Sequence, residues 1–297
     1  MATILVRFAT YLDLMLLFGT TAFAVTGSVG REPGKRWIAA AIVLALLLTA
    51  LSIANLAASM AGVPIGQLDR ATIAMVLGLP TIALPMAIRV VALVTALACL
   101  ALPDTTRRWG LCLAAAIALA SLSGIGHGLI DTAMAGWLHL GADIIHLWAA
   151  GMWLGAIMML FVRVQAARRE PASARAEEAW RAAANFARTG TLLVGAIVLT
   201  GAVNGIAIIG WSGLPALPTT PYGRLLIAKL LLFAAMLALA AANRFRHVPR
   251  LRAALDRRGP ADALVRLKRS LIAEAACGIA VLALVAWLGT LDPAGAS

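Results

Sequence analysis

The sequence predicts an all-α, polytopic membrane protein: one transmembrane domain over residues 1–297, built as a bundle of about eight helices. Hydrophobic residues make up 62% of the chain and charged residues only 13%, and the mean hydropathy is +0.92. A soluble protein of this size would lack the charge to cover its surface. The apolar runs are about twenty residues long and do not alternate with polar residues, which favours helices over a barrel.

Eight apolar segments are long enough to cross a bilayer at about 1.5 Å rise per residue. They cover residues 8–29, 37–58, 72–101, 109–126, 139–162, 186–210, 222–243 and 270–290. The third contains Pro80 and Pro85, and proline interrupts the hydrogen bonding of a helix. We therefore expect the stretch before Pro80 to lie along the interface and the span itself to begin near Ile82.

The distribution of Lys and Arg predicts the orientation. Every second connection between predicted spans is rich in Lys and Arg. Residues 30–36 hold three of them, residues 102–108 two, residues 163–188 six and residues 244–269 nine, which makes 20 of the 25 in the chain. The other loops and tails hold only Arg7 and Arg70. Cytoplasmic loops are the ones enriched in Lys and Arg, so both termini are predicted to be periplasmic in a bacterial inner membrane.

Several function classes are disfavoured. The net charge of +12 lies in loops without interleaved aromatic residues, which argues against nucleic-acid binding. Cys99, Cys112 and Cys277 lie within apolar segments, so no disulfide framework is expected. Asp13 interrupts the first apolar run, which argues against a cleavable signal peptide. No nucleophile–base pattern points to an enzyme, and no phosphate-binding loop points to ATP as a direct energy source.

A faint internal repeat is visible at an offset of about half the chain, as in transporters built from parallel repeats. Leu79-Pro80-Thr81 precedes a span that contains Arg89, and Leu217-Pro218-Thr219 precedes one that contains Lys229. The sequence therefore predicts two halves of four helices each.

Ionisable and thioether side chains gather near the predicted periplasmic ends of the spans, where each polar group costs free energy and therefore needs a reason. The candidate metal ligands are Asp13, Met15, His127, His139, Asp143 and His146. The last three are spaced i, i+4 and i+7, so they share one helical face. Imidazole and thioether together suit copper, and a nearby carboxylate can orient a histidine ring. The alternative is that these side chains only line a solvated vestibule.

The other charges within spans are expected to form pairs. Arg89, Arg224 and Lys229 lie near the predicted periplasmic face and would snorkel or pair with Asp13 or Asp143. Glu274 begins the last predicted span at the cytoplasmic side and is expected to pair with a loop arginine.

Three segments resemble the CopD family of copper-resistance membrane proteins. Residues 143–155 (DIIHLWAAGMWLG) are similar to the family pattern D-x-x-H-L-x-A-A-x-x-W-x-G-G, with Ala156 in place of the final Gly. Residues 220–229 (TPYGRLLIAK) resemble T-P-Y-G-R-L-L-x-x-K, and residues 243–251 (NRFRHVPRL) resemble N-R-x-x-x-x-P-x-L. Thr200–Asn204 and Gly126-His127 also fit. The likeness is strong over residues 120–251 and weaker in the N-terminal half.

The resemblance implies copper movement across the inner membrane, alongside a small periplasmic copper-binding protein of the CopC type. The family's histidine positions correspond to His127 and His146. We therefore expect copper, as Cu(I) or Cu(II), to be taken up toward the cytoplasm. Two alternatives stay open: a haem-binding electron-transfer protein that uses the same two histidines as axial ligands, and a copper sensor or scaffold that does not transport.

Overall fold

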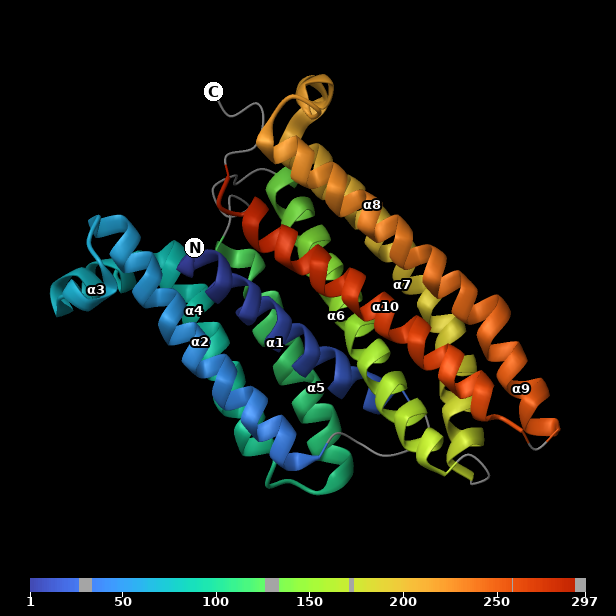
Figure 1. The fold of residues 1–297 in the computed structure, drawn as a ribbon. Coiled ribbons are helices and arrows are strands. Elements are labelled where there is room, and N and C mark those ends of the chain that lie inside the picture. The colour runs from blue at the N-terminus through green and yellow to red at the C-terminus, as the bar shows by residue number, and fades with distance from the viewer. Residues whose placement is uncertain (27–33, 126–133, 171–173, 258, 292–297) are drawn as a thin grey trace.

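The computed structural model describes residues 1–26, 34–125, 134–170, 174–257 and 259–291, and these residues form helices and no strands (Figure 1). The long helices are α1 (Ala2–Val25), α2 (Lys35–Ala61), α4 (Pro80–Cys99), α5 (Asp104–Ala120), α6 (Met134–Arg169), α7 (Ala174–Gly213), α8 (Pro221–Ala242) and α10 (Ala261–Leu288). The short ones are α3 (Arg70–Leu77), α9 (Val248–Asp256), the 3₁₀ turns Ile65–Gln67, Ser123–Ile125 and Leu214–Ala216, and a π turn, Asn243–His247. The predicted helical bundle is confirmed.

In the described part of the chain, seven helices are long and apolar enough to span a membrane, and α9 extends the one that begins with α8. The eighth predicted span is α5, whose 17 residues measure about 25 Å, near the lower limit for crossing. Arg7 of α1 donates a hydrogen bond to the Gly289 carbonyl, at 2.8 Å, just beyond α10. Because both chain ends meet at one end of the bundle, the number of crossings is even and α5 completes it. We call this the terminal end and the opposite one the basic end.

The third predicted span, residues 72–101, is wrong as a single helix. Leu79 has an extended backbone and Pro80 starts α4, so α3 is a separate short helix that projects from the terminal end (Figure 1). The Asp69 side chain caps α3 by accepting a hydrogen bond from the Thr72 backbone N–H at 2.8 Å. The expectation that the span starts close to Ile82 is confirmed, and Pro85 remains inside α4.

Several helices extend past the predicted spans. Helix α6 has 36 residues, against a predicted span of residues 139–162. Helix α7 begins at Ala174, before the predicted span of residues 186–210, and is interrupted by a kink at Gly210 (φ 67°), where that span was predicted to end. Hydropathy marks where a helix leaves lipid, whereas the backbone hydrogen bonds continue into the polar turns. His139 consequently lies inside α6 and not at its start. The predicted ends of the first and fourth spans fall at residues 29 and 126, outside the described residues.

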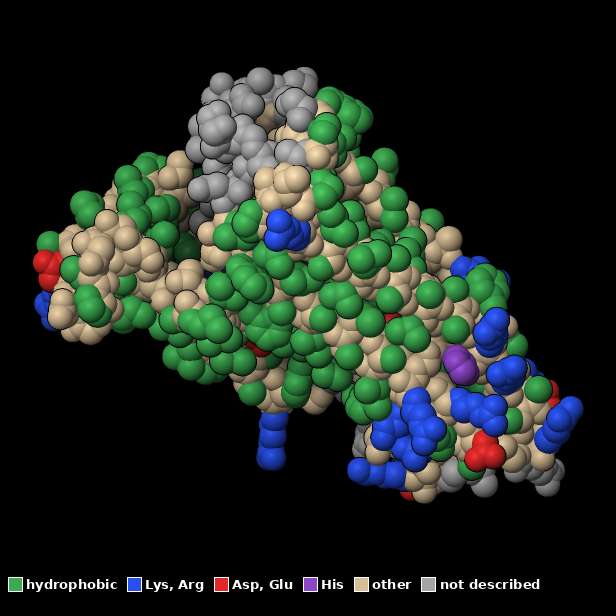
Figure 2. All heavy atoms as spheres, turned by 45° about the horizontal axis from the view of Figure 1, so that its top comes forward, with side chains coloured by type: hydrophobic (Ala, Val, Ile, Leu, Met, Phe, Trp, Pro, Cys, Tyr) green, Lys and Arg blue, Asp and Glu red, His purple; other side chains and the backbone are tan. Residues whose placement is uncertain are grey.

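The surface of the bundle is that of a membrane protein. Large apolar side chains in the middle of the helices are exposed, such as Val91 at 65% and Leu199 at 69%. Figure 2 shows hydrophobic side chains over most of the visible face and Lys and Arg side chains gathered at the basic end. Five of the six exposed tryptophans among the described residues lie near helix ends, as in an interfacial aromatic belt. These five are Trp37, Trp109, Trp137, Trp211 and Trp287, whereas Trp148 lies within α6.

The two halves of the bundle pack in a similar order, with one difference: α2 packs against α4, whereas no comparable contact joins α7 to α8 in the described part of the chain. In the N-terminal half, α1 packs against α2 and α5, and α5 packs against α4; in the C-terminal half, α6 packs against α7 and α10, and α10 packs against α8. The contacts between halves also correspond, because α1 touches α10 and α6 touches α5. Arg89 and Lys229 lie at similar depths in α4 and α8, each of which begins with a proline.

Helices α1 and α6 join the two halves at a contact between glycines. A Cβ atom placed on Gly19 would lie 1.9 Å from the Gly151 carbonyl oxygen, and one on Gly155 would lie 2.1 Å from the Gly19 carbonyl carbon. Gly151 and Gly155 are spaced as G-x-x-x-G, which lets helix backbones approach closely in membranes. The buried side chains Met15, Phe18 and Leu119 surround this contact.

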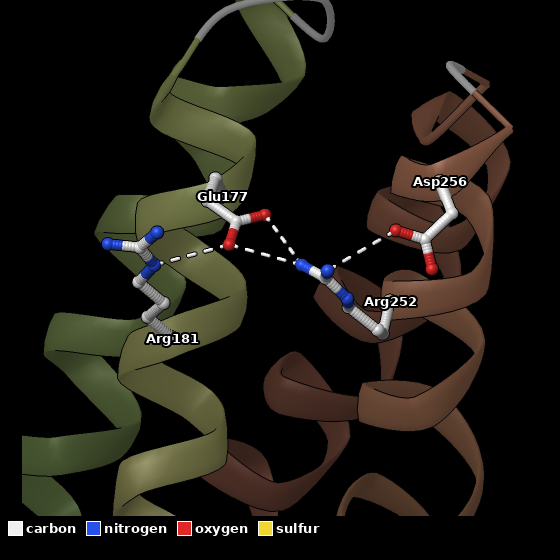
Figure 3. A network of polar contacts seen from close by, with 4 residues as sticks. All are labelled: Glu177, Arg181, Arg252 and Asp256. Atoms are coloured by element: carbon white, nitrogen blue, oxygen red, sulfur yellow. Dashed lines mark hydrogen bonds and ion pairs between the residues drawn. The ribbon is translucent and has the colours of Figure 1, made fainter.

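Four charged side chains link α7 to α9 at the basic end (Figure 3). The Arg252 guanidinium donates to both Glu177 carboxylate oxygens at 3.2 Å and lies 3.4 Å from Asp256. Arg181 bonds the same Glu177 at 3.2 Å, and Arg252 also covers the Trp180 ring. The two arginines and Asp256 are exposed and Glu177 is partly exposed, so each pair stabilises the fold by about 1 kcal/mol or less.

Candidate metal centre

The candidate site lies in the C-terminal half, in the part of the bundle nearer the terminal end. Asp143 and His146 are three residues apart on α6, so both side chains face α7. Thr200 and Asn204, four residues apart on α7, face them. The His146 Nδ1 atom is 3.0 Å from the Thr200 Oγ1 atom, and the Asn204 Nδ2 atom donates to the Asp143 Oδ1 atom at 3.2 Å.

The Thr200 hydroxyl group determines the tautomer of His146. Its one proton is donated back along α7 to the Ala196 carbonyl, at 2.5 Å. The Thr200 oxygen therefore accepts the bond from His146, which requires a proton on Nδ1. In the neutral ring the lone pair is then on Nε2, the atom that is left available for a metal ion. The ring also packs on Gly201, whose Cβ position is 3.4 Å from the His146 Cε1 atom.

Lys229 on α8 provides the positive charge of the site. It is half-buried and interacts electrostatically with both Asp143 and His146. Asp143 is thus the carboxylate whose charge acts on Lys229, although no ion pair within 4.0 Å joins the two among the described residues. The ammonium offsets part of the charge of this carboxylate within the membrane.

The residues of segment 220–229 that precede Lys229 build the start of α8. Thr220 caps the helix by accepting a hydrogen bond from the Gly223 N–H at 3.1 Å, and Pro221 occupies the first position. A Cβ atom on Gly223 would lie 1.9 Å from the Leu217 carbonyl oxygen, so no other residue fits there. Arg224 donates to the carbonyls of Pro218 and Thr219 and so braces the turn instead of pairing with a carboxylate. These residues determine where Lys229 lies.

The other predicted ligands are not joined to this pair. His139 is one turn before Asp143 on the half-exposed part of α6. Met15 is buried at the glycine contact with α6. Asp13 has a buried Oδ2 atom without a hydrogen-bond partner, and its charge does not interact with His146. His127 lies outside the described residues, as does Asp131.

Two further expectations for charged groups were wrong. Glu274 does not pair with a loop arginine: its carboxylate accepts hydrogen bonds from Trp153 and Asn243, each at 2.8 Å. Arg89 is 1% exposed and donates to the Ser121 hydroxyl at 2.9 Å, not to Asp13. Sequence distance explains both errors, because 121 residues separate Glu274 from Trp153 and 32 separate Arg89 from Ser121.

Within the described ranges, no three His, Cys, Asp or Glu side chains converge as a complete metal site. What the structure does assemble is one oriented imidazole, one carboxylate and their hydrogen-bonded supports. From the sequence, Thr200 and Asn204 were noted only because they fit a family motif. Their i, i+4 spacing places both on one face of α7, where they hydrogen-bond His146 and Asp143.

Comparisons of the sequence with known proteins match the chain to copper resistance proteins. Residues 180–288 match the family described as copper resistance protein D, and residues 1–140 match copper resistance protein D-like, N-terminal domain. The chain is 33% identical over 301 residues to copper resistance protein D of Pseudomonas syringae pv. tomato, covering 98% of this chain and 96% of that protein. It is 30% identical over 173 residues to inner membrane protein YebZ of Escherichia coli (strain K12), covering 58% of this chain and 55% of that protein. No solved structure matches the chain. The chain is a multi-pass membrane protein that belongs to the copper resistance protein D family.

Proposed function

We propose that this protein carries copper across the bacterial inner membrane, from the periplasm toward the cytoplasm, and that it captures the ion at His146. The observation that carries the proposal is the contact between His146 Nδ1 and Thr200 Oγ1, since a Thr200 oxygen that accepts from Nδ1 leaves the Nε2 lone pair available. A histidine whose other nitrogen donates to a fixed oxygen is typical of metal sites. Imidazole binds both Cu(I) and Cu(II).

The charges around His146 support reversible binding. Asp143 offers a carboxylate one turn away on the same helix, and Lys229 offsets its charge in the empty site. An arriving copper ion brings positive charge of its own and competes with the ammonium for Asp143. A site whose empty state already has a cation near the carboxylate releases its ion more readily than one with an uncompensated carboxylate.

The remaining ligands are proposed from the sequence. His127 and His139 would add imidazoles at the terminal end, and Asp13 and Met15 would act as the next station inward. The bias of Lys and Arg toward the basic end supports a periplasmic terminal end. YebZ is named an inner membrane protein, which supports that location here. A CopC-type protein is the proposed periplasmic donor, and the proposed role involves no catalysis.

Copper accumulation in cells that depend on this protein tests the proposal. His146→Ala should reduce copper accumulation to the level of cells without the protein. The matched control is His247→Ala, because His247 lies in the π turn toward the basic end and is expected to leave accumulation unchanged. If the His146 variant accumulates as much copper as the wild type, His146 is not the capture site.

Transport by purified protein in vesicles separates the alternatives. Copper uptake into sealed vesicles supports transport, whereas stoichiometric binding without uptake identifies a sensor or scaffold. A Soret band in the purified protein would identify haem and overturn the copper proposal.

A further inference from the structure

A second buried polar cluster lies deeper in the C-terminal half. The Glu274 side chain, on α10, is 3% exposed. Its Oε1 atom accepts a hydrogen bond from the Trp153 Nε1 atom of α6, and its Oε2 atom accepts one from the Asn243 Nδ2 atom at the end of α8. Trp153 is two turns, roughly 10 Å, further along α6 than His146, toward the basic end.

Within the described ranges, no opposite charge contacts this carboxyl group. The groups that bond it are the neutral side chains of Trp153 and Asn243. The elements packed against α10 carry these charged residues and histidines: Arg7 and Asp13 on α1; His139, Asp143, His146, Arg163, Arg168 and Arg169 on α6; Arg224 and Lys229 on α8; Arg244, Arg246 and His247 in the π turn; and Arg250, Arg252 and Asp256 on α9. No ion pair in the described part of the chain joins any of them to Glu274. Because an isolated charge is costly inside a membrane, such a group is neutralised by binding a proton.

Asn243 is suited to bond both forms of this carboxyl group. Its Oδ1 atom is buried and has no hydrogen-bond partner among the described residues. In the structure the Asn243 amide NH₂ donates to Glu274, an orientation that suits the ionised form of the carboxyl group. When Glu274 is protonated, its O–H can donate to Oδ1 after the amide turns over. The buried Ser270 hydroxyl, one turn earlier on α10, also lacks a partner and adds unused hydrogen-bonding capacity.

Asn243 begins the π turn that joins α8 to α9. A π turn holds one extra residue, and such turns occur often at functional sites because they reorient side chains. Here the turn lies against α10 and brings the Asn243 amide, which is 9% exposed, to Glu274. The irregular backbone thus coincides with the one buried carboxyl–amide pair between α8 and α10 in the described ranges.

We propose that Glu274 is a proton-exchange site within the membrane domain, with Asn243 as its hydrogen-bond partner in both protonation states. The carboxylate takes a proton from hydronium to give the carboxylic acid and water, and returns it in the reverse step. Each exchange changes the charge of the C-terminal half by one unit. This site is separate from His146 and does not depend on copper binding there.

Infrared difference spectroscopy of the full-length protein in lipid vesicles tests the assignment through a pH titration. Wild-type protein should show the C=O band of a buried carboxylic acid that grows as the pH falls. The band should be absent in Glu274→Gln and retained in the control Glu177→Gln, which changes a partly exposed glutamate at the basic end. A band that persists in Glu274→Gln, or no titrating carboxyl band in the wild type, would overturn the proposal.

Two further measurements test the proposal even if the Glu274→Gln variant does not fold. Wild-type protein labelled with ¹³C-glutamate should shift the band to lower frequency, whereas an unshifted band would belong to an aspartate such as Asp13 and would contradict the assignment. Asn243→Leu should move the band to higher frequency, because the carboxylic acid loses a hydrogen bond. An unchanged frequency would exclude Asn243 as the partner.

Discussion

At the residue scale, the chemistry of His146 is determined by a neighbour's hydroxyl group. Thr200 is bound to its own helix through Ala196, so it can only accept from the imidazole. Asn204 likewise fixes Asp143, because its amide NH₂ donates a hydrogen bond to the carboxylate. The sequence supplied the spacing of Asp143 and His146, but the protonated nitrogen follows only from a contact between residues 54 positions apart.

Replacing Thr200 tests this control of the tautomer. Thr200→Val keeps the shape of the side chain but removes the acceptor of the Nδ1 proton, so copper affinity should fall by about 10- to 100-fold. Competition with a copper chelator measures the affinity, and ¹⁵N spectra of histidine-labelled protein report the tautomer. Thr49→Val is the matched control, because Thr49 is a buried threonine whose hydroxyl bonds only its own helix, at Ala45. Equal losses in both variants would contradict the role of Thr200.

At the element scale, the fold depends on where helices approach without side chains between them. Gly19, Gly151 and Gly155 allow α1 and α6 to cross in backbone contact, and this crossing joins the two halves. Gly223 serves the turn before α8 in the same way, beside the Leu217 carbonyl. The sequence shows these glycines plainly, but it does not say which of the 26 glycines are in contact with another backbone.

Alanine substitutions at two glycines should affect the stability of the fold differently. Gly19→Ala places a methyl group on the Gly151 carbonyl and forces α1 from α6, which should cost about 1–3 kcal/mol or more of stability. Gly195→Ala, on the open face of α7, meets nothing within 4 Å and should be neutral or stabilising by up to about 1 kcal/mol. Thermal unfolding in detergent, followed by loss of the monodisperse peak, compares the two. A melting temperature unchanged by Gly19→Ala would rule out the close crossing.

At the scale of the whole molecule, two halves share one architecture but differ in their chemistry. Each half has a cation on an equivalent helix, Arg89 on α4 and Lys229 on α8. Arg89 is fully buried against Ser121, whereas Lys229 interacts with a carboxylate and an imidazole. In the described ranges, the imidazole with an available nitrogen belongs to the C-terminal half. The two halves thus pack in a similar way, and the C-terminal half carries the candidate copper ligand His146.

The predicted orientation can be tested with single cysteines in a background that lacks Cys99, Cys112 and Cys277. A membrane-impermeant thiol reagent, applied to intact cells with a permeable outer membrane, should label Ala2→Cys at the terminal end. Glu170→Cys, at the basic end, should be labelled only after lysis. The reverse pattern would place the termini in the cytoplasm.

The sequence by itself determined the fold class and the candidate pair Asp143 and His146, because lipid demands long apolar helices and because helical spacing is local. It also predicted two halves, and the structure shows that they pack in a similar but not identical way. Only the tertiary structure decided the partners. It joined Glu274 to Trp153 and Asn243, gave His146 its Thr200 acceptor and separated α3 from α4. These outcomes depend on which helix faces lie together, and inside a membrane every buried polar group must find its partner across such a face.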